Sequence, residues 1–375
     1  MGTTGLHSHG LAGDEITPDW APLTDAEVVA VLDHYALPSS TARVVWRSPR
    51  PLSAAAQVVA GSSKVFVKRH HESVRDATEL ATEHAFMAHL RMHGLPIPDV
   101  LTTTAGDSVV TRGQWSYEVH AIARGLDIHR DRFSWEPLTD LAQARTAGHM
   151  LARLHQASAN FPPHARHTHI LVSRDELLRA DNLVTTLQGQ FPQRPALAAY
   201  LARHDWPRDM ARLIERQRHV QPRLATQPRL WTHNDWHVTN LFWSDNTSDA
   251  TITAVLDFGL AAPTFALYDL ATAIERNAIA WLQLEHGNDI GHPDTANALV
   301  DGYAEVLPLT LAERQWLADL LPVVHLDFAV SEIEYFHGIT HHTEHADVAY
   351  RTFLLGHAHW FDTPQGQRFT QAIAG

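Results

Sequence analysis

Hydrophobic and polar positions along the chain follow two different spacings. Up to about residue 121, short apolar runs rich in β-branched and aromatic residues predict strands, and only the segments near 25–35 and 73–93 read as helices. After about residue 122, apolar residues recur every three or four positions, which is typical of helices. We therefore predict an α+β protein with two lobes, a sheet with one long helix in residues 23–121 and a larger helical lobe in residues 122–375.

Two short segments interrupt the helical pattern with polar residues at fixed offsets. Residues 233–240 read His-Asn-Asp-Trp-His-Val-Thr-Asn, and Asp257 directly follows the apolar run 254–256, ahead of Phe-Gly. Phosphoryl transfer needs a carboxylate to orient the attacking hydroxyl, and an Asn and a second carboxylate to hold metal ions. An ordinary polar turn is the alternative for one segment alone, but the two together favour a phosphoryl-transfer site.

The strand predicted over residues 63–69 carries the only two lysines of the chain, Lys64 and Lys68, among 29 basic residues. Lys68 ends a Val-Phe-Val-Lys stretch, which is similar to the strand that directs an ammonium group at nucleotide phosphates. We expect Lys64 to be a solvated strand end and Lys68 to contact phosphate.

The helix predicted over residues 73–93 supplies carboxylates for this lysine. Glu83 lies three residues after Leu80 and therefore on or beside the inward face of the helix. Because an unpaired buried charge is costly, we expect Glu83 to pair with Lys68. Glu79, one turn earlier, is the competing candidate, and a surface salt bridge is the alternative role for either residue.

Composition excludes several other functions. The chain of 375 residues has a formal net charge of -13, which argues against nucleic-acid binding, and no apolar run is long enough to cross a membrane. Cysteine is absent, which excludes disulfides and thiolate metal sites and agrees with a reducing, cytoplasmic location. Residues 1–22 read as a flexible tail and not as a secretory signal. The oligomeric state stays open.

Histidine is frequent, with 28 in the chain. The densest group, His341-His342-Thr343-Glu344-His345, suggests a metal site, but most histidines lack the spacing of metal ligands. A histidine-rich metal-binding protein therefore remains an alternative to an enzyme.

Together these motifs resemble the aminoglycoside phosphotransferase/choline kinase-type superfamily of small-molecule kinases. The resemblance covers about residues 40–280 and is carried by His233-Asn234-Asp235 with Asn240, Leu256-Asp257-Phe258-Gly259, Tyr268-Asp269-Leu270-Ala271 and the helix that contains Gly148 to His155. It implies a bilobal, protein-kinase-like fold, with an antiparallel sheet in a nucleotide-binding N-terminal lobe and the catalytic loop and acceptor site in the helical lobe.

The resemblance implies a role for each matching position of the catalytic segments. Asp235 is similar to the catalytic base, and His233 to the residue that braces its loop. Asn240 and Asp257 match the ligands of magnesium ions. Asp269 matches a residue that orders the loop from the following helix.

On the nucleotide side, the resemblance implies ATP or GTP as the phosphate donor. Lys68 and Glu83 match the phosphate lysine and its partner, and the segment Tyr117-Glu118-Val119-His120-Ala121 is similar to the hinge that pairs with adenine. The loop ahead of the lysine strand departs from the pattern, because residues 47–57 contain no glycine. Ser53 is its candidate phosphate contact, although glycine would allow a closer approach.

The predicted activity is transfer of a γ-phosphoryl group to a hydroxyl of a metabolite or antibiotic, such as an aminoglycoside-like compound, an amino alcohol or a sugar. Four acidic residues could line the acceptor site and favour a cationic acceptor, or could equally lie on the surface: Asp301, Asp327, Glu332 and Glu334. The missing glycines leave one alternative, a catalytically impaired kinase-like protein with a binding or regulatory role. A protein kinase is disfavoured because no Ala-Pro-Glu segment follows Asp257.

Overall fold

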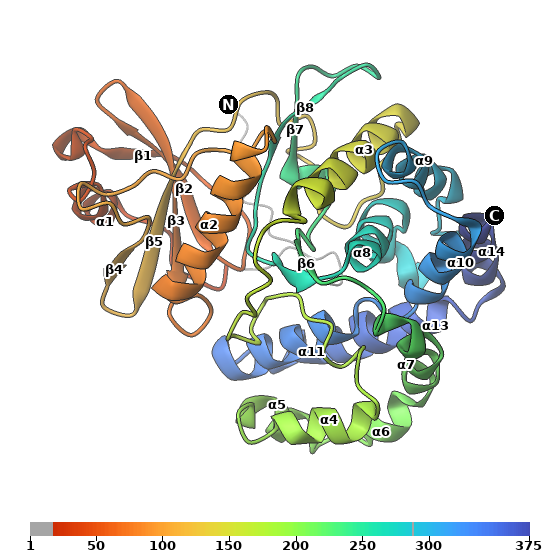
Figure 1. The fold of residues 1–375 in the computed structure, drawn as a ribbon. Helices are drawn as coiled ribbons and strands as arrows, with labels where there is room; N and C mark the ends of the chain where they lie inside the picture. The colour runs from red at the N-terminus through yellow and green to blue at the C-terminus, as the bar shows by residue number, and fades with distance from the viewer. Residues whose placement is uncertain (1–17, 287–288) are drawn as a thin grey trace. The chain divides into compact units, whose positions relative to one another are not determined.

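The computed structural model describes residues 18–286 and 289–375. The chain divides into two compact units, with the boundary between Arg124 and Gly125. Figure 1 shows that the first unit contains a sheet and that the second consists mainly of helices. The predicted α+β fold is confirmed. Of the predicted N-terminal tail, residues 1–17 lie outside the described residues.

The first unit is built on a five-stranded antiparallel sheet with the strand order β1-β2-β3-β5-β4. Its strands are β1 (Arg43–Arg47), β2 (Ala54–Ala60), β3 (Ser63–His71), β4 (Val110–Arg112) and β5 (Trp115–Ala121). Its helices are α1 (Asp25–Leu32), the short η1 (Ser39–Thr41) and α2 (Ala77–Met92). A capping box of Thr24 and Glu27 starts α1, and the Asp76 side chain caps α2.

One face of this sheet is apolar. Val65 and Val67 of β3 and Val119 of β5 are buried in one core with Val28 and Val31 of α1. Because strand side chains alternate between faces, the residues between these valines must lie on the other side.

The opposite face is polar and is covered by α2 (Figure 1). It carries Lys68 and His70 of β3 and Glu118 and His120 of β5, and His84 of α2 bonds to Glu118 there. The strand that bears the predicted phosphate lysine therefore separates an apolar core from a layer of charged and imidazole groups.

Near residues 100–103 the chain forms a single bridge, between Val100 and His120, in place of a strand. Pro96 and Pro98 lie just before it, and proline has no N–H to donate to a strand ladder.

The second unit consists of helices and two small antiparallel sheets, β6–β9 and β7–β8. The larger helices are α3 (Leu141–Ser158), α4 (Leu183–Gln190), α5 (Pro195–Leu201), α7 (Ala211–Leu224), α8 (Ala266–Ala278), α9 (Pro293–Ala304), α10 (Leu311–Leu320), α11 (Leu326–Glu334) and α14 (Pro364–Ala374). The shorter ones are α6 (Trp206–Asp209), η2 (Val238–Asn240), η3 (Trp281–His286), η4 (Tyr335–Ile339), α12 (Thr343–Val348), η5 (Ala349–Gly356) and α13 (His357–Trp360). The strands are β6 (Leu230–Thr232), β7 (Leu241–Trp243), β8 (Ile252–Val255) and β9 (Ala262–Thr264).

Two glycines bring α3 and α9 into close contact. A Cβ atom at Gly148 of α3 would lie 1.9 Å from the carbonyl oxygen of Leu299, and one at Gly302 of α9 would lie 1.9 Å from that of Arg145. Only glycine allows this approach, which explains the Gly148 position of the helix motif. Among the described residues, no helix is long and apolar enough to span a membrane.

Candidate active site

The loop that contains Asp235 follows β6 and is fastened to α8 by one carboxylate. Asp269, in the first turn of α8, accepts hydrogen bonds from the backbone N–H groups of His233 and Asn234, both at 2.8 Å. Its Oδ2 is also 2.9 Å from Nε2 of His155, which α3 supplies. Asn234 has a left-handed backbone with φ 62°, a conformation that asparagine tolerates better than most residues. These contacts set the direction in which the chain leaves β6.

His233 links this loop to the segment before Asp257. Its Nε2 is 2.9 Å from the carbonyl oxygen of Leu256, and its Nδ1 is 3.2 Å from the backbone nitrogen of Asp235. The ring therefore donates to Leu256 and accepts from Asp235. The N–H of Leu256 in turn donates to the carbonyl of Asn240 at 2.9 Å. Both predicted catalytic segments are thus joined inside the second unit.

The Asp235 carboxylate is buried among positive and polar groups. Its Oδ1 forms an ion pair with Arg276 at 3.0 Å, and its Oδ2 lies 3.1 Å from Nδ2 of Asn240 and 3.4 Å from Nε2 of His237. Burial alone would raise the pKa of Asp235, but the charges of Arg276 and His237 outweigh it and hold that pKa below its usual range. Asp235 is therefore ionised at neutral pH.

Sequence reasoning missed two of these neighbours. Arg276 lies seven residues after Asp269 on α8, so the two side chains share a helix face, and its guanidinium also stacks over Trp135 at 3.9 Å. This seven-residue spacing could have predicted that Arg276 lies on the same face of α8 as Asp269. His237 lies within the motif itself, two residues after Asp235.

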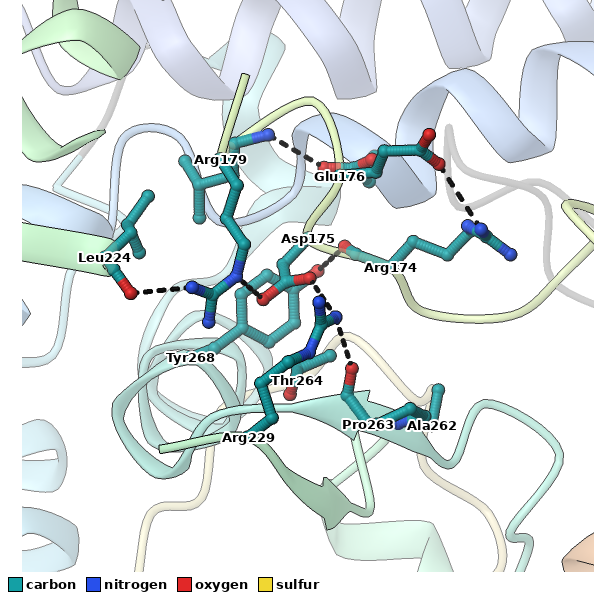
Figure 2. A network of polar contacts seen from close by, with 12 residues as sticks. Arg174, Asp175, Glu176, Arg179, Leu224, Arg229, Ala262, Pro263, Thr264 and Tyr268 are labelled. Atoms are coloured by element: carbon teal, nitrogen blue, oxygen red, sulfur yellow. Dashed lines mark hydrogen bonds and ion pairs between the residues drawn. The ribbon is translucent and has the colours of Figure 1, made fainter. Parts of the chain in front are cut away.

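The strands that position this loop are supported by an acidic residue, Asp175, which the sequence pattern did not indicate. Figure 2 shows Asp175 between Arg179 and Arg229. Its carboxylate oxygens lie 2.6 Å from Nε of Arg179 and 2.7 Å from Nη2 of Arg229. Arg229 directly precedes β6 and also donates to the carbonyl of Pro263 in β9, at 2.9 Å. Arg179 donates to the carbonyl of Leu224 at the end of α7. Asp175 is buried, so its two ion pairs hold both arginines in place. Through these arginines it also supports the β6–β9 pair.

The predicted nucleotide contacts lie in the first unit. Ser53 is in the turn between β1 and β2, and Lys68 lies in β3 opposite Glu118 of β5. Glu83 is buried on α2, where its Oε2 is 4.0 Å from Nε of Arg75. Arg75 is thus a partner of this carboxylate that the sequence did not suggest, and the pairing of Glu83 with Lys68 stays a prediction.

The predicted adenine contacts lie inside β5. The backbone of Tyr117, Glu118 and Val119 pairs with β3, and the carbonyl of Val119 also accepts from the N–H of Leu101 at 2.8 Å. The Tyr117 hydroxyl donates to Glu27, and Glu118 is bonded to histidines. A base could pair only with backbone groups that these bonds leave free, and adenine binding by this segment stays a prediction.

Comparisons with known proteins identify the family. Residues 52–309 match the model of APH, the phosphotransferase enzyme family. The chain belongs to this family. The predicted superfamily and the predicted phosphotransferase acting on an alcohol group are therefore confirmed, and the chain is a small-molecule kinase by family. A comparison with curated proteins finds no match.

Solved structures of kinases share the fold of this family member. A microcompartment-associated aminopropanol kinase has 18% identity and a TM-score of 0.61, with 91% of this chain and 98% of that chain covered. An amicoumacin kinase in complex with AMP-PNP and Ca²⁺ has 13% identity and a TM-score of 0.56, with 85% and 91% covered. An aminoglycoside phosphotransferase from Alicyclobacillus acidocaldarius has 17% identity and a TM-score of 0.53, with 94% and 98% covered.

Proposed function

We propose that the protein transfers the γ-phosphoryl group of ATP or GTP to a hydroxyl of a small amine-bearing alcohol in a magnesium-dependent reaction. One observation carries the phosphoryl-transfer part: short hydrogen bonds join Asp235, Asn240 and Leu256, the residue before Asp257, inside one unit. In the first unit, Lys68, Glu83 and Ser53 remain our proposed nucleotide contacts.

The donor atoms of Asn240 and Asp257 suit a magnesium ion. The amide nitrogen of Asn240 donates to the Asp235 carboxylate at 3.1 Å and to the Asp235 backbone carbonyl at 3.0 Å, so the amide oxygen is the atom that would bind a metal ion. Asp257 adds a carboxylate, and magnesium prefers oxygen ligands. When bound, the ion neutralises charge on the phosphates during transfer.

We assign Asp235 the role of the residue that receives the acceptor hydroxyl. Its ionised carboxylate accepts a hydrogen bond from the hydroxyl, aligns its oxygen with the phosphorus and takes the proton as the new bond forms. A lowered pKa makes Asp235 a weak base. That property agrees with a loose transition state, in which positioning contributes more than early proton removal.

Glu332 supports an acceptor that carries an amine. Three of the four acidic residues considered for the acceptor site have structural partners: Asp327 accepts the N–H groups of Leu177 and Leu178, Glu334 pairs with Arg194, and Asp301 pairs with Arg314. Glu332 is buried, and its Oε2 has no hydrogen-bond partner among the described residues. The charges of Asp235 and Arg276 both act on the pKa of Glu332, so Glu332 lies within electrostatic range of Asp235.

A cationic group on the acceptor would supply the missing partner of Glu332 while its hydroxyl contacts Asp235. Amino alcohols have both groups, and aminopropanol, on which one of the similar proteins acts, is the simplest probe. A cavity lined by Asn234, Glu275 and Arg276 measures about 20 Å³, enough for about one water molecule, so we do not assign the acceptor to it.

The test is a nucleotide-consumption screen with amino alcohols, aminoglycosides and sugars, each paired with an analogue that lacks the amine. We expect magnesium-dependent consumption with ATP or GTP, a preference for the amine-bearing member of each pair, and loss of that preference in Glu332→Gln. Equal turnover of the amine-bearing acceptor and its analogue would refute only the proposal that the acceptor carries an amine. Nucleotide binding without transfer to any acceptor would favour the catalytically impaired alternative.

A further inference from the structure

Four side chains from three elements meet on the polar face of the sheet in the first unit. Glu118 and His120 are two residues apart on β5 and therefore point to the same face. His84 reaches them from α2, and His70 from β3. All four lie within the first unit, whereas Asp235 and Asp257 belong to the second unit.

The distances within this cluster are short. Oε2 of Glu118 lies 2.7 Å from Nε2 of His84 and 2.9 Å from Nε2 of His120. Its other oxygen, Oε1, lies 3.0 Å from Nε2 of His70. In the described parts of the chain, His84, Glu118 and His120 are the one set of three potential metal ligands whose donor atoms lie within 4.8 Å of one another. The segment His341–His345, which the sequence singled out, does not form such a set there.

We propose that His84, Glu118 and His120 bind one divalent transition-metal ion of the zinc class. Two imidazole nitrogens and one carboxylate oxygen are a ligand set that zinc uses when it keeps a further position for water. Imidazole favours zinc, copper, nickel and iron over magnesium and calcium, so the ion is chemically distinct from the magnesium proposed for phosphoryl transfer.

Two further residues are placed as the outer partners that such ligands need. Oγ of Ser108 lies 2.9 Å from Nδ1 of His84, so Nδ1–H can donate to it while Nε2 binds the metal. His70 contacts the carboxylate oxygen that the two ligand histidines do not contact, and so orients Glu118. The His120 side chain is 14% exposed, whereas Glu118 is 2% exposed, which gives the site an opening on the His120 side.

A carboxylate hydrogen-bonded by three imidazoles and without a metal is the alternative arrangement. It satisfies the same groups, but it predicts no stoichiometric metal binding.

The experiment is a titration of the metal-stripped full-length chain with Zn²⁺ in competition with a chromophoric chelator, repeated with Co²⁺ to read the ligand-field absorption. We expect one equivalent of metal to bind. Removing one ligand in His84→Gln or His120→Gln should weaken binding about 100-fold or more and change the Co²⁺ spectrum, and His70→Gln should weaken it about 10-fold. His93→Gln, an exposed histidine just after the same helix as His84, is the matched control and should bind like the wild type.

Several results would overturn the proposal. Absence of stoichiometric binding would favour the metal-free cluster, and unchanged binding in both ligand variants would place the ion elsewhere, for example at His341–His345. If the variants fail to fold, X-ray absorption of the wild-type chain with one equivalent of Zn²⁺ decides. Two imidazoles and a carboxylate are expected, and a shell of three or more imidazoles would contradict the assignment.

Discussion

Asp235 and Glu332 are buried carboxyl groups of the same unit, and their surroundings act on them in opposite directions. Burial disfavours charge on both. At Asp235, Arg276 and His237 outweigh burial, and the pKa lies below its usual range. At Glu332, burial dominates and raises the pKa to about 8. Neighbouring acids with separated pKa values are typical of divided roles in an active site. The contrast indicates that Asp235 stays ionised and can accept a hydrogen bond from the acceptor hydroxyl, while Glu332 can pair with a cationic group of the acceptor.

The largest expected effect comes from neutralising the ionised member of the pair. Asp235→Asn keeps the shape of the side chain but removes its charge and its ability to take a proton. We expect turnover to fall by about a thousandfold or more, with nucleotide affinity nearly unchanged, as measured by steady-state kinetics and nucleotide titration. Asp249→Asn, an exposed residue of the same unit, is the control. Turnover that survives in Asp235→Asn would remove Asp235 from the chemistry.

Replacing Asp257 tests whether a nearby carboxylate serves the metal and not the hydroxyl. Asp257→Ala should abolish the magnesium-dependent part of nucleotide binding, because alanine has no oxygen ligand. The measurement is a thermal-shift titration with nucleotide, with and without Mg²⁺, beside Asp249→Ala. An unchanged magnesium-dependent shift would show that Asp257 is not a ligand.

Some contacts of Asp235 could be predicted from the sequence because the residues involved are close together in the chain. His233, Asp235 and Asn240 lie within eight residues, and a phosphoryl-transfer loop needs them at those offsets, so spacing alone predicted that they would meet. The α+β division was readable for a similar reason, since apolar spacing changes from strand-like to helical at about residue 122.

The cluster around Glu118 could not be predicted from the sequence, because its four members come from β3, α2 and β5. Their meeting depends on sheet register and on which face α2 covers, and neither follows from spacing along one segment. The same limit applies to the predicted adenine contact. The segment 117–121 has the composition of a strand, but only the pairing with β3 shows that its backbone takes part in the sheet.

Removing Arg276 tests the cause of the contrast through pH. If Asp235 must be ionised, activity is lost as pH falls through its pKa, which Arg276 helps to hold below the usual value of 3.8. In Arg276→Met the positive charge that opposes the effect of burial is lost, and the pKa of Asp235 rises. The acidic limb of the pH profile of kcat/KM should therefore move to higher pH by about one to three pH units. Arg276→Lys keeps the charge and should move the limb less. An unshifted limb in Arg276→Met would show that the ion pair does not set the ionisation of Asp235.

The smallest effect concerns Glu332 and the stability of the fold. The folded-state pKa is raised from 4.5 to about 8, so the folded chain holds a proton that the unfolded chain has released between these values. Stability therefore falls as pH rises from about 4.5 to about 8 and is then constant with respect to this group. Glu332→Gln removes this dependence and should be more stable than the wild type at pH 9, by on the order of a few kcal/mol, and nearly equal to it at pH 5.

Urea unfolding of both chains at several pH values measures this difference, with Glu344→Gln, an exposed glutamate of the same unit, as the control. A difference between wild type and Glu332→Gln that stays constant from pH 5 to 9 would mean that Glu332 is already ionised and paired. In that case the carboxyl would have no unmet need for a cation, and the argument for an amine on the acceptor would fail, while the assignment of Asp235 would stand.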